Sequence, residues 1–158
     1  MKQELYFEIA KHLFVVETPD RDLTSKLLPS FRSFFVGNDF KVNTNGGNNI
    51  LFRFSGNKKI LIPKIKPIEK MNFEGTEFNV YQVIGGTTIS MKIEDHIHYM
   101  FASNDYKIFN TDLTLTEKEE SMYILFLLRA AYGMAAIHHQ TIKIHASVTE
   151  KDGKALLF

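Results

Sequence analysis

Four short segments of alternating apolar and polar residues follow one another in the middle of the chain, and they constrain the fold more than any other feature. Turn-forming pairs separate them: Gly85-Gly86, Glu94-Asp95 and Asn104-Asp105. Alternation with period two is typical of half-buried strands, and such short spacing is typical of antiparallel neighbours. The sequence therefore predicts a meander with strands at 78–84, 87–93, 97–102 and 106–109.

The N-terminal part of the chain carries further strand signals. Alternating residues at 5–9 and an apolar run at 13–16 predict a strand pair. Alternation at 50–54, the turn Gly56-Asn57 and the apolar return at 60–62 predict a second hairpin.

Three other segments before the meander are expected to be irregular. Pro29 interrupts the helical spacing between residues 23 and 36, so we expect short helical or irregular pieces that cover the core. The polar loop from Asn43 to Asn49 is expected to be the most mobile segment. Pro63 and Pro67 predict an extended connector before the meander.

A long helix is predicted after the meander. The residues from Thr116 to Glu119 fit a capping box, so the helix should begin there. From 122 to 137 it is apolar nearly all round, which is typical of a helix buried between layers. A membrane span needs about 20 apolar residues without a central charge, and Arg129 lies in the middle of this shorter run. Arg129 either extends to water, which we favour, or is a buried partner for a carboxylate.

The chain closes with a predicted hairpin. A strand alternates over 142–148, Asp152-Gly153 supplies a two-residue turn, and 155–158 should pair back onto it. The predicted fold class is α+β, a largely antiparallel sheet of hairpins and a meander packed on one long buried helix. We divide the chain into a β-rich region, 1–112, and a helix-plus-hairpin region, 113–158, which can form one compact unit with the first.

Composition excludes several classes of function. Lysine and arginine number 19 against 18 aspartates and glutamates, so no bulk field attracts nucleic acid or an anionic membrane, and neither partner is expected. The absence of cysteine excludes disulfides and thiolate chemistry. Glu4 and Glu8 interrupt any signal-peptide core, and we expect a cytoplasmic protein.

Histidines are the candidate ligands and catalysts. His96 and His98 share a strand face and could approach one metal, but no third ligand stands at a fixed spacing, so we favour two solvated histidines and no metal site. His138, His139 and His145 form a second loose group, in which a helix-end role is favoured for the first two. The chain shows no Ser-His-Asp order and no Gly-x-Gly-x-x-Gly, and its phenylalanines alternate as core residues rather than as a base-stacking surface.

The pair Gly153-Lys154 looks like the end of a phosphate-binding loop sequence. The pattern Gly-x-x-x-x-Gly-Lys-[Ser/Thr] would need glycine where Val148 stands and a hydroxyl residue where Ala155 stands. The turn interpretation is therefore preferred, and no cofactor site is predicted in this chain.

Two stretches resemble a known family. The segment His145-Ala146-Ser147-Val148, with the turn and Lys154-Ala155-Leu156-Leu157-Phe158 after it, resembles the hairpin that precedes the phosphate loop in proteins related to bacterial HPr kinase/phosphorylase, a serine-kinase branch of the phosphoenolpyruvate-carboxykinase-like fold. The helix from Leu128 to His139 looks like the helix upstream of it. The resemblance covers about the last third of the chain.

The resemblance implies one site residue, and it implies that the rest of the phosphate site would lie outside these 158 residues. His145 matches the active-site histidine before the phosphate loop, where it would act near the transferred phosphoryl group. ATP and magnesium are implied only for a full-length relative, since the phosphate loop would lie beyond Phe158, and the chain alone is expected to be catalytically silent. The alternative is a stand-alone β-rich binding or regulatory module. In either case the open strand edge at 155–158 predicts self-association into a homo-oligomer; the substrate stays unknown.

Overall fold

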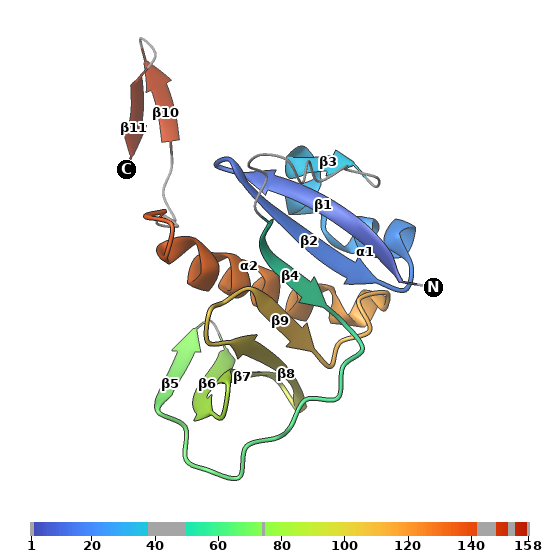
Figure 1. Cartoon of the computed structure of the whole chain (residues 1–158), viewed down its shortest axis with the longest axis vertical. Coiled ribbons are helices and arrows are strands. Elements are labelled where there is room, and N and C mark those ends of the chain that lie inside the picture. Colours follow the sequence, from blue (N-terminus) through green and yellow to red (C-terminus); the bar gives the residue numbers. More distant parts are fainter. Residues whose placement is uncertain (1, 38–49, 74, 142–147, 152–153, 158) are drawn as a thin grey trace.

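A computed structural model describes residues 2–37, 50–73, 75–141, 148–151 and 154–157, and Figure 1 shows their arrangement. Nine of the described strands form one sheet: β1 (Gln3–Ile9), β2 (His12–Thr18), β3 (Phe35–Gly37), β4 (Ile50–Ser55), β5 (Glu69–Phe73), β6 (Thr76–Val83), β7 (Gly86–Ile93), β8 (His96–Ser103) and β9 (Ile108–Thr111). Their order is β3-β1-β2-β4-β9-β8-β7-β6-β5. Neighbours are antiparallel except that β4 is parallel to both β2 and β9. The predicted α+β class with a largely antiparallel sheet is confirmed.

The N-terminal strand pair is confirmed. β1 and β2 are antiparallel, and Ala10 and Lys11 form the turn between them with φ of 50° and 67°. Positive φ at both central residues gives a turn whose twist matches the strands, although side chains other than glycine adopt it at a cost. In this register Phe7 lies opposite Phe14, and both side chains are buried.

Two short helical pieces follow, as the interruption by Pro29 predicts. Helix α1 (Arg21–Leu27) begins after Asp20, whose carboxylate accepts the backbone N–H groups of residues 22 and 23 at 3.0 Å. Pro29 opens the 3-10 helix η1 (Pro29–Phe34), a position where its missing N–H is not needed. The buried Phe31 places η1 against the core. The loop from Asn43 to Asn49 lies outside the described residues.

The meander is confirmed as β6 to β9, each strand antiparallel to the next. The predicted last strand begins two residues too early, because Tyr106 belongs to the turn and has a φ of 53°. Residue 108 is therefore the first to join the sheet.

The predicted hairpin between 50–54 and 60–62 is wrong. β4 lies between β2 and β9, so neither of its edges is free for the 60–62 segment. Residues 56–68 include no strand; they form the connector that leads from β4 to β5 and carries both prolines. The physical reason is burial: Phe52 and Phe54 are fully buried, and a central position in the sheet covers them better than a local hairpin could.

The long helix is present, but its start differs from the prediction. The 3-10 turn η2 (Lys118–Glu120) leads into α2 (Ser121–Ile137), and neither has a side-chain cap, so the predicted capping box does not form. Instead, the Glu120 carboxylate reaches back to Thr114 and Leu115. It accepts both of their backbone N–H groups and the Thr114 hydroxyl at 2.8–3.1 Å. Glu120 thus fixes the loop before the helix.

Helix α2 covers one face of the sheet rather than lying between two layers (Figure 1). Eight of its residues are buried: Tyr123, Ile124, Leu127, Leu128, Ala131, Tyr132, Ala135 and Ala136. Four more apolar residues of the helix, Leu125, Phe126, Ala130 and Met134, are partly buried against the core, whereas Met122 and Ile137 near its two ends are 52% and 63% exposed. Within the described ranges, the stretch Lys118–Ile137 is the one helix long and apolar enough to cross a membrane by length and composition, a test that core helices also pass.

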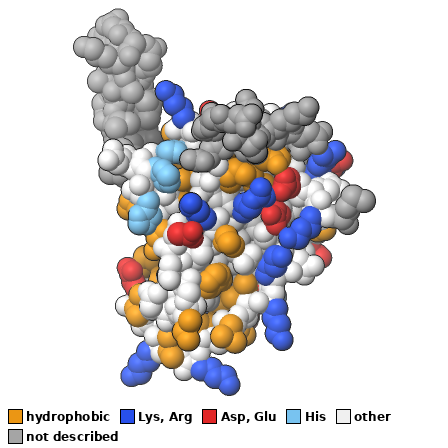
Figure 2. All heavy atoms as spheres, viewed as in Figure 1, with side chains coloured by type: hydrophobic (Ala, Val, Ile, Leu, Met, Phe, Trp, Pro, Cys, Tyr) orange, Lys and Arg blue, Asp and Glu red, His pale blue; other side chains and the backbone are white. Residues whose placement is uncertain are grey.

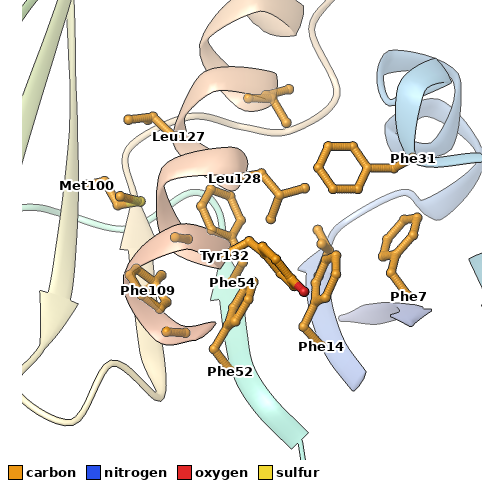
Figure 3. Close-up of a cluster of buried hydrophobic side chains, with 14 of the residues drawn as sticks. Phe7, Phe14, Phe31, Phe52, Phe54, Met100, Phe109, Leu127, Leu128 and Tyr132 are labelled. Carbon is orange, nitrogen blue, oxygen red and sulfur yellow. The ribbon is translucent and has the colours of Figure 1, made fainter. Parts of the chain in front are cut away.

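Phenylalanines form the centre of the core, as the alternation predicts (Figure 3). The Phe14 ring stacks on Phe7 and Phe52 with centroids 5.3 and 4.8 Å apart, and Phe52 meets Phe109 edge-on at 5.2 Å. Tyr132 from α2 lies 5.9 Å from Phe14. Strands of the 1–112 region and the helix of the 113–158 region therefore share one hydrophobic core.

The C-terminal hairpin forms with a different register. β10 (Val148–Lys151) and β11 (Lys154–Leu157) pair as a separate two-stranded sheet, with Val148 opposite Leu157. The predicted pairing of 155–158 with 142–148 is wrong in register, because residues 149–151 belong to the strand and pair with 154–156, which leaves Val148 opposite Leu157. Residues 142–147 lie outside the described part.

Candidate functional site at the end of helix α2

The C-terminal end of α2 brings His138 and His139 to the surface. After Ile137 the backbone tightens: the N–H groups of His139 and Thr141 both donate to the Ala136 carbonyl, at 2.9 and 3.2 Å. Both histidines are exposed directly past the helix end, where the sequence places them. A protonated imidazole there interacts favourably with the helix dipole.

His12, which sequence analysis did not single out, joins this group from the start of β2. Its Nε2 lies 2.8 Å from the Thr141 hydroxyl, and its ring centroid lies 5.6 Å from that of His139. No local pattern predicts this contact, because 129 positions separate His12 from Thr141.

Tyr106 contacts His138, the remaining histidine of the group. Its ring stacks on His138 with centroids 5.2 Å apart and an interplanar angle of 28°, and it also stacks on Phe109 of the core with centroids 6.4 Å apart. The group His12, His138 and His139 therefore joins the helix end to β2 and to the β8–β9 turn. Histidine side chains, pale blue, lie at the surface on this side of the molecule in Figure 2.

The chemistry available to this group is proton transfer. Imidazoles exchange protons near neutral pH, and a hydroxyl hydrogen-bonded to an imidazole nitrogen is the first part of a nucleophile–base arrangement. The His12–Thr141 pair lacks the third part, because none of the described hydrogen bonds joins His12 to a carboxylate. Across the described ranges, no three or more histidines, aspartates or glutamates are grouped so that they could hold a metal ion.

His145, the residue that the resemblance places in an active site, lies outside the described residues. What the structure describes on either side of it is the end of α2 with its histidine group and the start of β10.

No protein-family model, curated protein or solved structure matches this chain.

His96 and His98 occupy a different place, on the α2 side of β8. His96 is exposed, whereas the His98 ring packs edge-on against Tyr123 with centroids 4.5 Å apart. The His98 Nδ1 lies 3.4 Å from a carboxylate oxygen of Asp112, without the geometry of a hydrogen bond, and that oxygen already accepts the Tyr99 N–H at 2.9 Å. His98 is thus a half-buried histidine at the edge of the core, so the expectation of two solvated histidines holds for His96 and is wrong for His98.

Arg129 lies half-buried on α2, in a pocket of about 200 Å³ that Phe31, Phe34 and Tyr132 also line. No described carboxylate lies within ion-pair distance of it, so the alternative of a buried carboxylate partner fails for the described part of the chain. The favoured interpretation, a side chain that extends toward water along apolar neighbours, agrees with this environment.

A charged cluster that sequence analysis missed lies on the sheet face away from α2. Arg53 on β4 donates to Glu4 at 2.7 Å and to Glu17 at 3.2 Å. Glu4 and Glu17 lie directly opposite each other on β1 and β2. One guanidinium therefore separates two carboxylates that would otherwise repel.

The surroundings of Glu4 and Glu17 lower the pKa values of both carboxylates. A hydrogen bond from the Tyr6 hydroxyl, followed by the Arg53 contact, lowers the pKa of Glu4 below its usual value of 4.5. Burial acts to raise the pKa of Glu17, but hydrogen bonds from Ser55, Lys2 and Arg53 outweigh it, and the net direction is downward. Both side chains are accordingly ionised at neutral pH, which fits a structural ion-pair network.

Proposed function

We propose that this chain is the front portion of a protein related to HPr kinase/phosphorylase, and that residues 1–158 by themselves do not transfer phosphate. The observation that supports the proposal most is the hairpin β10–β11, which follows α2 as its own two-stranded sheet, apart from the nine-stranded one (Figure 1). This order, a long helix and then a short hairpin, is what the resemblance implies.

The reason for inactivity is chemical. Phosphoryl transfer needs converging backbone N–H groups, a lysine and a magnesium ligand around the phosphates. The 158 residues contain no Gly-x-x-x-x-Gly-Lys-[Ser/Thr] sequence, and Lys154 belongs to strand β11 instead of a phosphate loop. His145 is the candidate catalytic residue, and this assignment rests on the resemblance alone. ATP and magnesium belong to the proposal only for a longer relative.

The test measures nucleotide turnover and binding by the purified chain. We expect no hydrolysis of ATP above a buffer control with magnesium present, and no heat of MgATP binding by calorimetry. Hydrolysis that is lost in the His145→Ala variant would contradict the proposal. Reading the coding sequence after codon 158 separates family from activity: a glycine-rich loop ending in Gly-Lys-Ser or Gly-Lys-Thr supports the relationship, and a stop codon counts against it.

A β-rich binding module that self-associates is the second candidate. β5 is the last strand of the described sheet order, and all five of its residues are exposed, so its outer backbone groups face solvent. The separate hairpin favours association too, because an isolated two-stranded sheet is marginal in water. Light scattering at increasing concentration checks this, and a clean monomer throughout would exclude it.

A further inference from the structure

A pocket of about 360 Å³ lies on the sheet face away from α2. Its floor is a row of three residues on adjacent strands: Thr88 on β7 lies opposite Phe101 on β8, which lies opposite Asn110 on β9. Met100 and Ala102, which alternate with Phe101, point into the core under α2, so Phe101 points to the other face. The pocket is thus separate from the histidine group.

Two segments distant in sequence form the walls. One is the start of the connector, Lys58 to Leu61, and the other is the tip of the β6–β7 hairpin, Val83 and Ile84. Leu61 is 83% exposed and Ile84 is fully exposed. Large apolar side chains that are exposed to solvent on both walls of a pocket indicate a surface that a ligand covers. Hydrophobic side chains gather over the lower part of Figure 2, where β5 to β9 lie, with Lys and Arg side chains along the margin.

Gly86 shapes this pocket. A Cβ atom at this position would lie 2.9 Å from two atoms of the Phe101 ring and 1.9 Å from the Ala102 carbonyl oxygen. Only glycine therefore lets the Phe101 ring lie over β7 and form part of the pocket. The second glycine of the Gly85-Gly86 turn thus has a role that its turn position does not reveal.

The polar groups of the pocket favour an anion. Lys58 and Lys59 are its charged lining residues, and no acidic residue lines it. Five of the 19 basic residues but one of the 18 acidic residues fall between positions 58 and 70, so this stretch carries +4 in a chain of net +1. At the floor, the hydroxyl of Thr88 and the side-chain amide of Asn110 form no hydrogen bond within the described part of the chain. Both groups are therefore able to bind a ligand.

We propose that this pocket binds a small amphiphilic carboxylate. Its apolar chain lies between Leu61, Ile84 and Phe101, and its carboxylate pairs with Lys59. Pockets of this size with apolar walls and a few polar groups are typical of small-ligand sites. A second copy of the chain is a poorer occupant, because it would bring two +4 connectors together.

The experiment titrates octanoate into the isotope-labelled 158-residue chain and follows amide and methyl resonances by NMR. We expect saturable shifts at Thr88, Phe101 and Asn110 and at the methyl groups of Leu61 and Ile84. Lys59→Glu should weaken binding about tenfold, because it replaces an attraction with a repulsion. The matched variant Lys26→Glu, at an exposed position of α1, should leave the affinity within about twofold.

Four outcomes of the titration would overturn the proposal, and a fifth would come from varying the protein concentration. They are the absence of saturable shifts, equal affinity for the uncharged 1-octanol, unchanged affinity in Lys59→Glu, and shifts confined to the Arg129 pocket. Movement of the same resonances with protein concentration alone would assign the surface to self-association and would also overturn it. Leu61→Ser, at an exposed position that tolerates a polar side chain, provides a second variant and should weaken octanoate binding through lost apolar contact.

Discussion

Removal of the Arg53 guanidinium should destabilise the sheet measurably. In Arg53→Met the apolar stem is kept, while Glu4 and Glu17 lose hydrogen bonds of 2.7 and 3.2 Å and face each other without the guanidinium, although the exposed Lys2 still pairs with Glu17 at 3.0 Å. Each lost contact is worth about 0.5–1 kcal/mol at a partly exposed position, and the opposed carboxylates add about 0.5 kcal/mol. We expect a loss of about 2 kcal/mol at pH 7.

Urea unfolding followed by circular dichroism measures this loss as a shift of the midpoint at unchanged slope. Arg32→Met is the matched control, since Arg32 is exposed on η1 and has no ion pair within the described ranges, and it should change the free energy of unfolding by less than about 0.5 kcal/mol. In a Glu4→Gln background the cost of Arg53→Met should shrink, because one of the repelling charges is gone. Equal effects of the two arginine substitutions would refute the reasoning.

Four further predictions follow from the described contacts. Folding lowers the pKa values of Glu4 and Glu17, so the stabilisation that they contribute is complete above the unfolded pKa of 4.5 and is lost as the pH falls through the lower folded pKa values. At pH values below 4.5 the urea concentration at the unfolding midpoint should therefore decrease. This decrease should be less steep in Glu17→Gln. Lys11→Gly should raise the free energy of unfolding by about 1 kcal/mol, since the φ of 67° strains lysine but not glycine, and a lower melting temperature would contradict this. Gly86→Ala should cost about 3 kcal/mol through its clash with the Ala102 carbonyl, whereas Gly133→Ala, in an open part of α2, should be neutral or stabilising in the same thermal melt. Phe14→Ala should cost about 3–5 kcal/mol by chemical denaturation because it leaves a cavity between Phe7, Phe52 and Tyr132, and a cost below about 1 kcal/mol would show that the core can close around it.

Local signals predicted the meander, the first hairpin and the long helix. Alternation with period two marks a strand, and a pair such as Glu94-Asp95 marks the turn after it, because both depend on residues within a few positions. The interruption at Pro29 was equally informative, since the effect of proline on the backbone is local. Phenylalanine alternation likewise identified Phe7, Phe52 and Phe54 as core residues.

The contacts of the candidate sites were not predictable in the same way. His12 meets Thr141 and Arg53 meets Glu4 because the sheet brings distant strands together, and no spacing in the chain encodes either pair. The pocket at Phe101 depends on a connector that the sequence suggested was half of a hairpin. His138 and His139 were placed correctly at the helix end, because a helix terminus is a local feature.

The sequence by itself determined the strands of the first hairpin and of the meander, the strand at 50–55, and the apolar helix that follows them, but it did not reveal β3 and β5 and it suggested a strand at 60–62 that the structure lacks. The tertiary structure alone decided that β4 lies between β2 and β9, parallel to both, and that α2 covers one face of the sheet. The physical reason is that a strand pattern specifies which side chains must be buried but not which backbone edge will pair with it. That choice depended on packing Phe14, Phe52 and Phe109 against one another under α2, and residues far apart in the chain make those contacts.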